Sequence, residues 1–149
     1  MSLRTRITDD MKDALRARDS ARLSAIRLLI AAIKQREVDE RIELSDADVL
    51  TVIDKMIKQR HDSISQFEAG NRPELADRER GEIAVLQQYL PAPLSDAEVD
   101  ALITDAIAAS GASGLSGMGK AMALLKPKLA GRADLASASA KVKAKLSGS

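Results

Sequence analysis

The residues best suited to hold a charged ligand lie in the last third of the chain. Four glycines come first, at Gly111, Gly114, Gly117 and Gly119. Residues 114–120 spell the G-x-x-x-x-G-K of a P-loop, but Ala121 stands where that motif needs a hydroxyl for magnesium. A P-loop also follows a strand, and the residues before this segment have a helical pattern. We therefore do not predict ATP or GTP hydrolysis.

The same glycine-rich segment contains two G-x-x-G runs, at residues 111–114 and 114–117. A KH domain uses such a run to clamp RNA, but it needs strands that this sequence does not predict. We interpret the segment as a flexible connector between helices. Backbone N–H groups at a glycine-led helix start, followed by Lys120, could still hold a phosphate.

Positive charge is concentrated after this connector. Residues 118–149 hold seven bases and one acid, whereas residues 95–117 hold four acids and no base. The seven candidate binding residues are Lys120, Lys126, Lys128, Arg132, Lys141, Lys143 and Lys145. Such a basic segment indicates an anionic partner. The alternative is that the lysines only keep an alanine-rich bundle soluble.

The other polar residues do not predict a catalytic or metal site. The chain has no cysteine and one histidine, His61, and Asp62 beside it would point about 100° away on a helix. An acidic patch at Glu37, Asp39, Glu40 and Glu43 is interpreted as a solvated helix end rather than a magnesium site. We predict no catalytic residue, cofactor or metal.

The apolar spacing predicts helices throughout, so the expected fold class is all-α. Four helices are expected first, over residues 3–18, 20–40, 46–69 and 73–90. Asp19 or Ser20 is expected to cap the second helix and Ser45 the third, and Pro73 is expected to begin the fourth. The inner face of the first helix is expected to hold Leu3, Ile7, Met11, Ala14 and Leu15.

Pro91 and Pro93 stop the fourth helix, and we place a domain boundary there, giving residues 1–93 and 94–149. The second domain is expected to have three helices. Ser95 and Glu98 form a capping box for the first of them. Gly131 is expected to end the second helix, which Pro127 should kink or break near residues 123–125.

Composition limits the remaining possibilities. Aromatic residues are 1% of the chain, which argues against recognition of bases by stacking. No apolar run approaches the length of a membrane span, and the N-terminus lacks the apolar core of a signal peptide. From these features we expect a cytoplasmic protein without a membrane partner.

Several motifs together resemble the GatB/YqeY family. They are residues 23–34 (LSAIRLLIAAIK), 58–64 (KQRHDSI), 88–91 (QYLP), 118–122 (MGKAM) and 126–134 (KPKLAGRAD). This resemblance, which covers nearly the whole chain, implies a helical YqeY-type N-terminal domain followed by a small bundle like the tail of GatB, a component of tRNA amidotransferase. That enzyme is a glutamine-dependent carbon–nitrogen ligase that amidates Glu-tRNA(Gln) or Asp-tRNA(Asn).

The resemblance suggests a tRNA-associated accessory protein that binds RNA phosphates through its basic C-terminal helices and is not catalytic alone. Its partner would be tRNA or a complex for tRNA aminoacylation or amidation. The alternative is a helical adaptor that binds proteins and does not contact RNA. A free-standing ligase is a third hypothesis, but no residues in the sequence support it.

Overall fold

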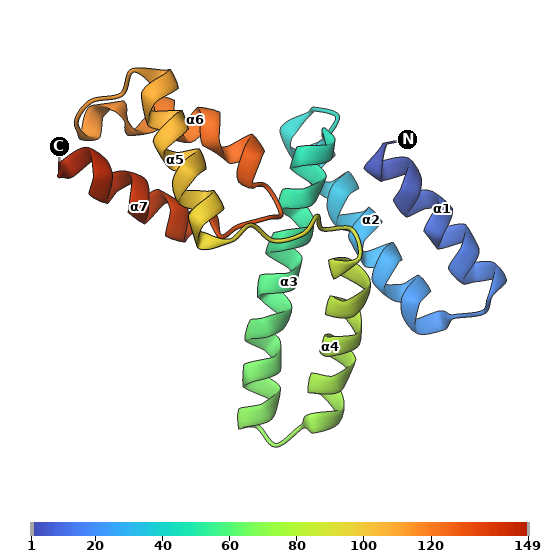
Figure 1. Cartoon of the computed structure of the whole chain (residues 1–149). Helices are drawn as coiled ribbons and strands as arrows, with labels where there is room; N and C mark the ends of the chain where they lie inside the picture. Colours follow the sequence, from blue (N-terminus) through green and yellow to red (C-terminus); the bar gives the residue numbers. More distant parts are fainter. Residues whose placement is uncertain (1, 149) are drawn as a thin grey trace. The chain divides into compact units, whose positions relative to one another are not determined.

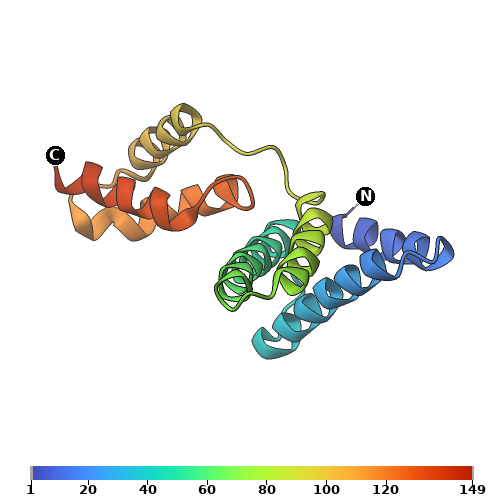
Figure 2. The same cartoon turned by 90° about the horizontal axis from the view of Figure 1, so that it is seen from below.

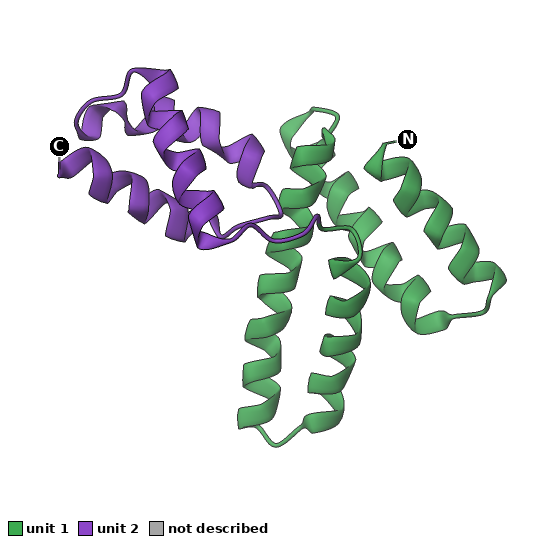
Figure 3. Cartoon of the chain, in the orientation of Figure 1, with its two compact units in different colours: residues 1–90 green, residues 91–149 purple. Residues whose placement is uncertain are grey.

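The computed structural model describes residues 2–148, and every regular element in that range is helical, which confirms the all-α prediction. The chain forms two compact units, residues 1–90 and 91–149. Figure 1 shows the helices and Figure 3 the two units. We call them the N-terminal unit and the C-terminal unit.

Four helices make up the N-terminal unit: α1 (Leu3–Arg16), α2 (Ser20–Glu40), α3 (Asp46–Ala69) and α4 (Pro73–Gln87). Helix α2 packs against each of the other three, and Figure 2 shows it running alongside α1 and α4. Ile26, Leu29 and Ile53 are fully buried at the centre of the core. The chain builds this core almost entirely from aliphatic side chains, as its low aromatic content requires.

The helix starts follow from local hydrogen bonds that the sequence predicts. The Asp19 carboxylate accepts from the Arg22 amide at 3.2 Å at the start of α2. At the start of α3, Ser45 and Asp48 form a reciprocal capping box, in which each side chain accepts from the backbone of the other. Pro73 occupies the first turn of α4, where its missing N–H costs nothing.

The end and the inner face of α1 differ from the prediction. The helix stops at Arg16 rather than residue 18, because Arg18 takes a left-handed conformation with φ 55°. Ile7 and Ala14 are buried as expected, but Leu15 is 56% exposed. The helices that contact α1 cover a narrower arc than the apolar stripe in the sequence, so Leu15 is left outside the core.

Tyr89, the only tyrosine of the chain, fixes the end of α4 to α1. Its side chain is 4% exposed, and its hydroxyl donates a hydrogen bond to the Asp10 carboxylate at 2.6 Å. Burial, followed by the hydrogen bond and the charge of Asp10, raises the pKa of Tyr89 well above its usual range. The Arg6 guanidinium lies 4.9 Å from the ring centroid and adds a cation–π contact.

Replacing Tyr89 by phenylalanine is expected to lower the free energy of unfolding by about 1–3 kcal/mol, because the half-buried Asp10 carboxylate loses its donor. Urea unfolding followed by circular dichroism measures this change. An unchanged midpoint would contradict the prediction and indicate that Arg22, whose guanidinium is 3.8 Å from Asp10, replaces the lost donor.

The C-terminal unit contains α5 (Asp96–Ser110), a short 3-10 turn η1 (Leu115–Gly117), α6 (Met118–Leu129) and α7 (Leu135–Ser147). Its core includes the fully buried Ile103, Leu125, Leu129 and Val142. Ser95 and Glu98 form the predicted capping box. The hydrogen bonds from Ser95 lower the pKa of the Glu98 carboxyl, with a smaller contribution from the charge of Arg132.

Pro127 does not break α6, which continues to Leu129. The proline cannot donate to the carbonyl of Ala123, but Ala123 lies on the exposed side of the helix, where water can replace that bond. The helix ends as predicted, with Gly131 in the left-handed conformation at φ 70°. Of the kink or break that was predicted, the break is therefore absent, and the glycine at the C-terminal end was correctly predicted.

Candidate nucleic-acid interface

Helix α6 carries three of the seven candidate residues, and its buried stripe decides where they lie. The buried residues are Ala121, Met122, Leu125 and Leu129. At about 100° per residue, Lys126 and Lys128 fall on opposite edges of this stripe, and Lys120 faces away from it. All three are exposed, and together they are spread over more than half of the circumference of α6.

Helix α7 divides its lysines between two sides. Lys141 and Lys145 are one turn apart and face α5: the Lys141 ammonium is 3.1 Å from the Asp100 carboxylate, and that of Lys145 donates to the Thr104 hydroxyl at 2.8 Å. Lys143 lies on the other side of α7 and is exposed. Two of the three predicted α7 ligands therefore already have partners within the unit.

Arg132 also has partners inside the C-terminal unit. Its Nε donates to the carbonyl oxygen of Ala92 at 3.1 Å, and its own carbonyl accepts from the Leu94 amide at 2.9 Å. These two bonds attach the segment before α5 to the turn between α6 and α7. The half-buried Arg132 thus has a structural role in addition to any role in binding.

Four candidate residues have no side-chain partner within residues 2–148: Lys120, Lys126, Lys128 and Lys143. Helix α6 starts without a side-chain cap, and Lys120 lies in its first turn, so backbone N–H groups and a cation occur together there. These four lysines and the start of α6 can attract a polyanion. No strand precedes the glycines in the described chain, and α5 occupies that place, so the P-loop geometry is absent.

The sequence did not identify Asp100 and Thr104 as partners of the α7 lysines. Asp100 and Thr104 are four residues apart, as are Lys141 and Lys145. This equal spacing was the signal in the sequence that could have indicated that the two pairs of side chains meet. Recognising it also requires knowing that α5 and α7 lie side by side, which is a tertiary property.

The acidic patch and the histidine are not part of this basic surface. Glu37 pairs with Arg4, Asp39 accepts from Gln35 at 2.9 Å, and Glu40 pairs with Arg36. The His61 side chain is exposed on α3. Among residues 2–148 there is no group of three or more histidine, cysteine, aspartate or glutamate side chains placed to hold a metal ion.

Comparison with known proteins gives one consistent result. The model of a family described as "Yqey-like protein" matches residues 4–146. The curated relatives include proteins named "Altered inheritance of mitochondria protein 41, mitochondrial". That of Lachancea thermotolerans is 37% identical over 99 residues, covering 64% of this chain and 53% of its own length. That of Kluyveromyces lactis is 36% identical over 106 residues, covering 66% and 57%.

The chain thus spans about half the length of the curated relatives it matches. The names of these relatives contradict the cytoplasmic location expected from the sequence, and that prediction is wrong. It rested on missing targeting features, and such absences do not determine a compartment, because an address segment is separate from the fold. In the described part of the chain, no helix combines the length and apolar character needed to cross a bilayer.

Proposed function

The chain belongs to the Yqey-like protein family, as its motifs predicted, and from this premise we propose that it is a tRNA-associated accessory protein. It binds the phosphate backbone through the C-terminal unit and is not catalytic alone. The supporting observation is the outer surface of α6, where Lys120, Lys126 and Lys128 are exposed and have no partner among the described residues. Lys143 on α7 is a fourth contact in this proposal.

The chemistry of this surface favours the backbone over the bases. Lysine is a point charge that neutralises phosphate without reading sequence. Base stacking needs exposed aromatic rings, but Tyr89 is buried and Phe67 is packed against the core of the N-terminal unit. We therefore expect affinity that depends on charge and RNA shape, with little preference for sequence.

The choice of tRNA rests on the resemblance of residues 125–134 to the tail of GatB in tRNA amidotransferase. In this proposal the chain assists tRNA aminoacylation or amidation by holding the RNA. In this proposal Arg132, Lys141 and Lys145 contribute to binding chiefly by stabilising the fold, because their side chains form hydrogen bonds within the C-terminal unit.

The test is a titration of labelled, unmodified tRNA by fluorescence anisotropy at two salt concentrations. With three or four neutralised phosphates, affinity is expected to fall roughly 40-fold to 150-fold over a fourfold rise in salt. The double variant Lys126→Glu, Lys128→Glu should bind more weakly and should lower the salt slope by about two.

A matched control reverses two exposed bases of the N-terminal unit, Lys55→Glu and Arg78→Glu, which changes the net charge equally. This control is expected to leave tRNA affinity within about twofold, since the proposal places the phosphate contacts in the C-terminal unit. Binding that ignores both salt and the α6 reversals would overturn the proposal and favour the protein–protein adaptor.

A further inference from the structure

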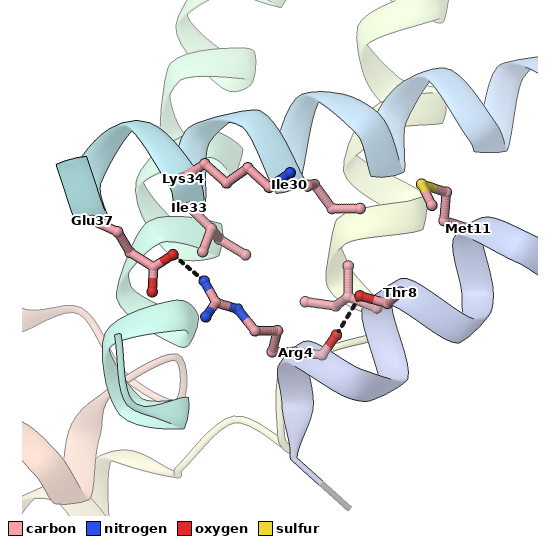
Figure 4. A pocket seen from close by; sticks show the side chains of 8 residues that line it. Arg4, Thr8, Met11, Ile30, Ile33, Lys34 and Glu37 are labelled. Atoms are coloured by element: carbon pink, nitrogen blue, oxygen red, sulfur yellow. Dashed lines mark hydrogen bonds and ion pairs between the residues drawn. The ribbon is translucent and has the colours of Figure 1, made fainter. Parts of the chain in front are cut away.

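A groove of about 400 Å³ runs between α1 and α2 in the N-terminal unit. Its walls are mainly apolar, with Ile7 and Met11 from α1 and Ile30 and Ile33 from α2. Figure 4 shows Met11 and Ile30 at one end of the groove and Arg4 and Glu37 at the other. Ile7 and Ile33 are buried in the core of the unit, so the apolar surface that a partner can reach in the groove is that of the half-buried Met11 and Ile30.

One end of the groove is closed by groups that satisfy one another. Arg4 donates to the Glu37 carboxylate, which also accepts from the Leu44 amide at 2.9 Å. These two hydrogen bonds, that of Arg4 first, lower the pKa of Glu37, so it stays ionised at neutral pH. Glu43 lies 3.8 Å from the same guanidinium. This end therefore holds one guanidinium and two carboxylates, and the positive charge of Lys34 also lowers the pKa of Glu37.

The sides of the groove carry three further cations. Lys34 lines the groove on α2, and Arg27 lies seven residues earlier on the same side of that helix. Lys12 on α1 lies one turn after Thr8, which lines the opposite wall. All three are exposed, and none has a side-chain hydrogen bond or ion pair within residues 2–148. We call Lys12, Arg27 and Lys34 the basic rim.

The length of the groove indicates the shape of its occupant. The α1 wall, from Arg4 to Met11, continues one turn further to Leu15, whose side chain is 56% exposed. At about 1.5 Å per residue this wall is about 16 Å long, or three turns of an α-helix. Two antiparallel helices with an apolar floor form the kind of groove that receives a third, amphipathic helix.

We propose that the α1–α2 groove binds a short amphipathic helix of a partner protein, with an apolar stripe on the groove walls and acidic residues against the basic rim. The apolar walls account for the stripe. The exposed Lys12, Arg27 and Lys34 account for the acidic flanks, because acidic side chains of the partner would offer these cations a counter-charge that a neutral or basic helix would not. This surface belongs to the N-terminal unit, whereas the proposed RNA contacts belong to the C-terminal unit.

The probe is a synthetic helical peptide of about 18 residues with leucines spaced three and four apart and glutamates on both flanks. A sibling peptide carries lysine in place of each glutamate. Each is titrated into the full chain, and binding is followed by anisotropy and by amide chemical shifts. The glutamate peptide is expected to shift residues 4–15 and 27–37 and to bind at least tenfold more tightly than its sibling.

Two double variants separate the groove from general charge effects. Lys12→Glu with Lys34→Glu is expected to weaken the glutamate peptide at least tenfold, whereas Lys55→Glu with Arg78→Glu should leave it within twofold. The Lys126→Glu, Lys128→Glu variant should also leave it unchanged, which keeps this test distinct from tRNA binding. Circular dichroism checks that each variant is folded.

Three outcomes overturn the proposal. The first is that the lysine peptide binds as tightly as the glutamate peptide. The second is that the peptide shifts map to the C-terminal unit. The third is that reversing Lys12 and Lys34 abolishes tRNA binding and leaves peptide affinity intact, in which case this face belongs to the RNA and not to a protein helix.

Discussion

Replacing Leu125 by alanine is expected to unfold the C-terminal unit and leave the N-terminal unit folded. Leu125 is fully buried in the core shared by α5, α6 and α7. Loss of a buried leucine costs about 2–5 kcal/mol. At about 0.05–0.15 kcal/mol per residue, a unit as small as residues 91–149 has a stability of the same size.

Amide NMR spectra and thermal melting followed by circular dichroism measure this effect. The spectrum should lose the dispersed signals of α5, α6 and α7 and keep those of α1 to α4. Leu124, the adjacent residue of α6, is 43% exposed and supplies the control. Leu124→Ala is expected to change stability by less than about 0.5 kcal/mol. Equal effects of the two substitutions, or loss of signals from both units, would contradict the prediction.

Replacing Gly117 by alanine is expected to destabilise the same unit by about 1–3 kcal/mol. Gly117 ends the turn η1, and a Cβ added there would lie 2.7 Å from the Cβ of Ala112 and 2.9 Å from its Cα. Ala112 is packed against the core of the unit, so the backbone between α5 and α6 must move. The close approach of the two segments is what requires glycine at this position.

Gly119 provides a control with the opposite expected sign. It lies in α6, and an added Cβ would have no atom within 4 Å. Gly119→Ala should therefore stabilise the unit by about 0.4–1 kcal/mol, since alanine restricts the unfolded chain and favours helix. Urea unfolding of both variants measures the difference. If both glycines tolerate alanine equally, the tight contact at Ala112 is not present in solution.

The sequence could not predict that these two glycines have different roles. Gly117 and Gly119 both belong to the glycine-rich segment, which was interpreted as a flexible connector. In the structure, one glycine permits a close contact between η1 and Ala112, and the other is an ordinary member of a helix. Only the path of the backbone between α5 and α6 distinguishes them.

The basic residues of the C-terminal unit also show the difference between what the sequence reveals and what only helix packing reveals. Their number and position could be counted in the sequence, and the excess of positive charge after residue 118 was plain. The sequence could not show which of these side chains already have partners in the folded unit. Lys141 faces Asp100, and Arg132 binds the carbonyl of Ala92, because residues 40 and 41 positions apart meet when three helices pack around one core.

The sequence by itself determined the all-α class, most helix starts and most of the core, because these depend on groups within about four residues of one another. Asp19, Ser45 and Ser95 cap their own helices whatever else the chain does. The tertiary structure alone decided that Leu15 is exposed, that two α7 lysines are occupied and that α1 and α2 leave a groove. Each of these depends on which helices become neighbours, and that is a property of the whole packed unit.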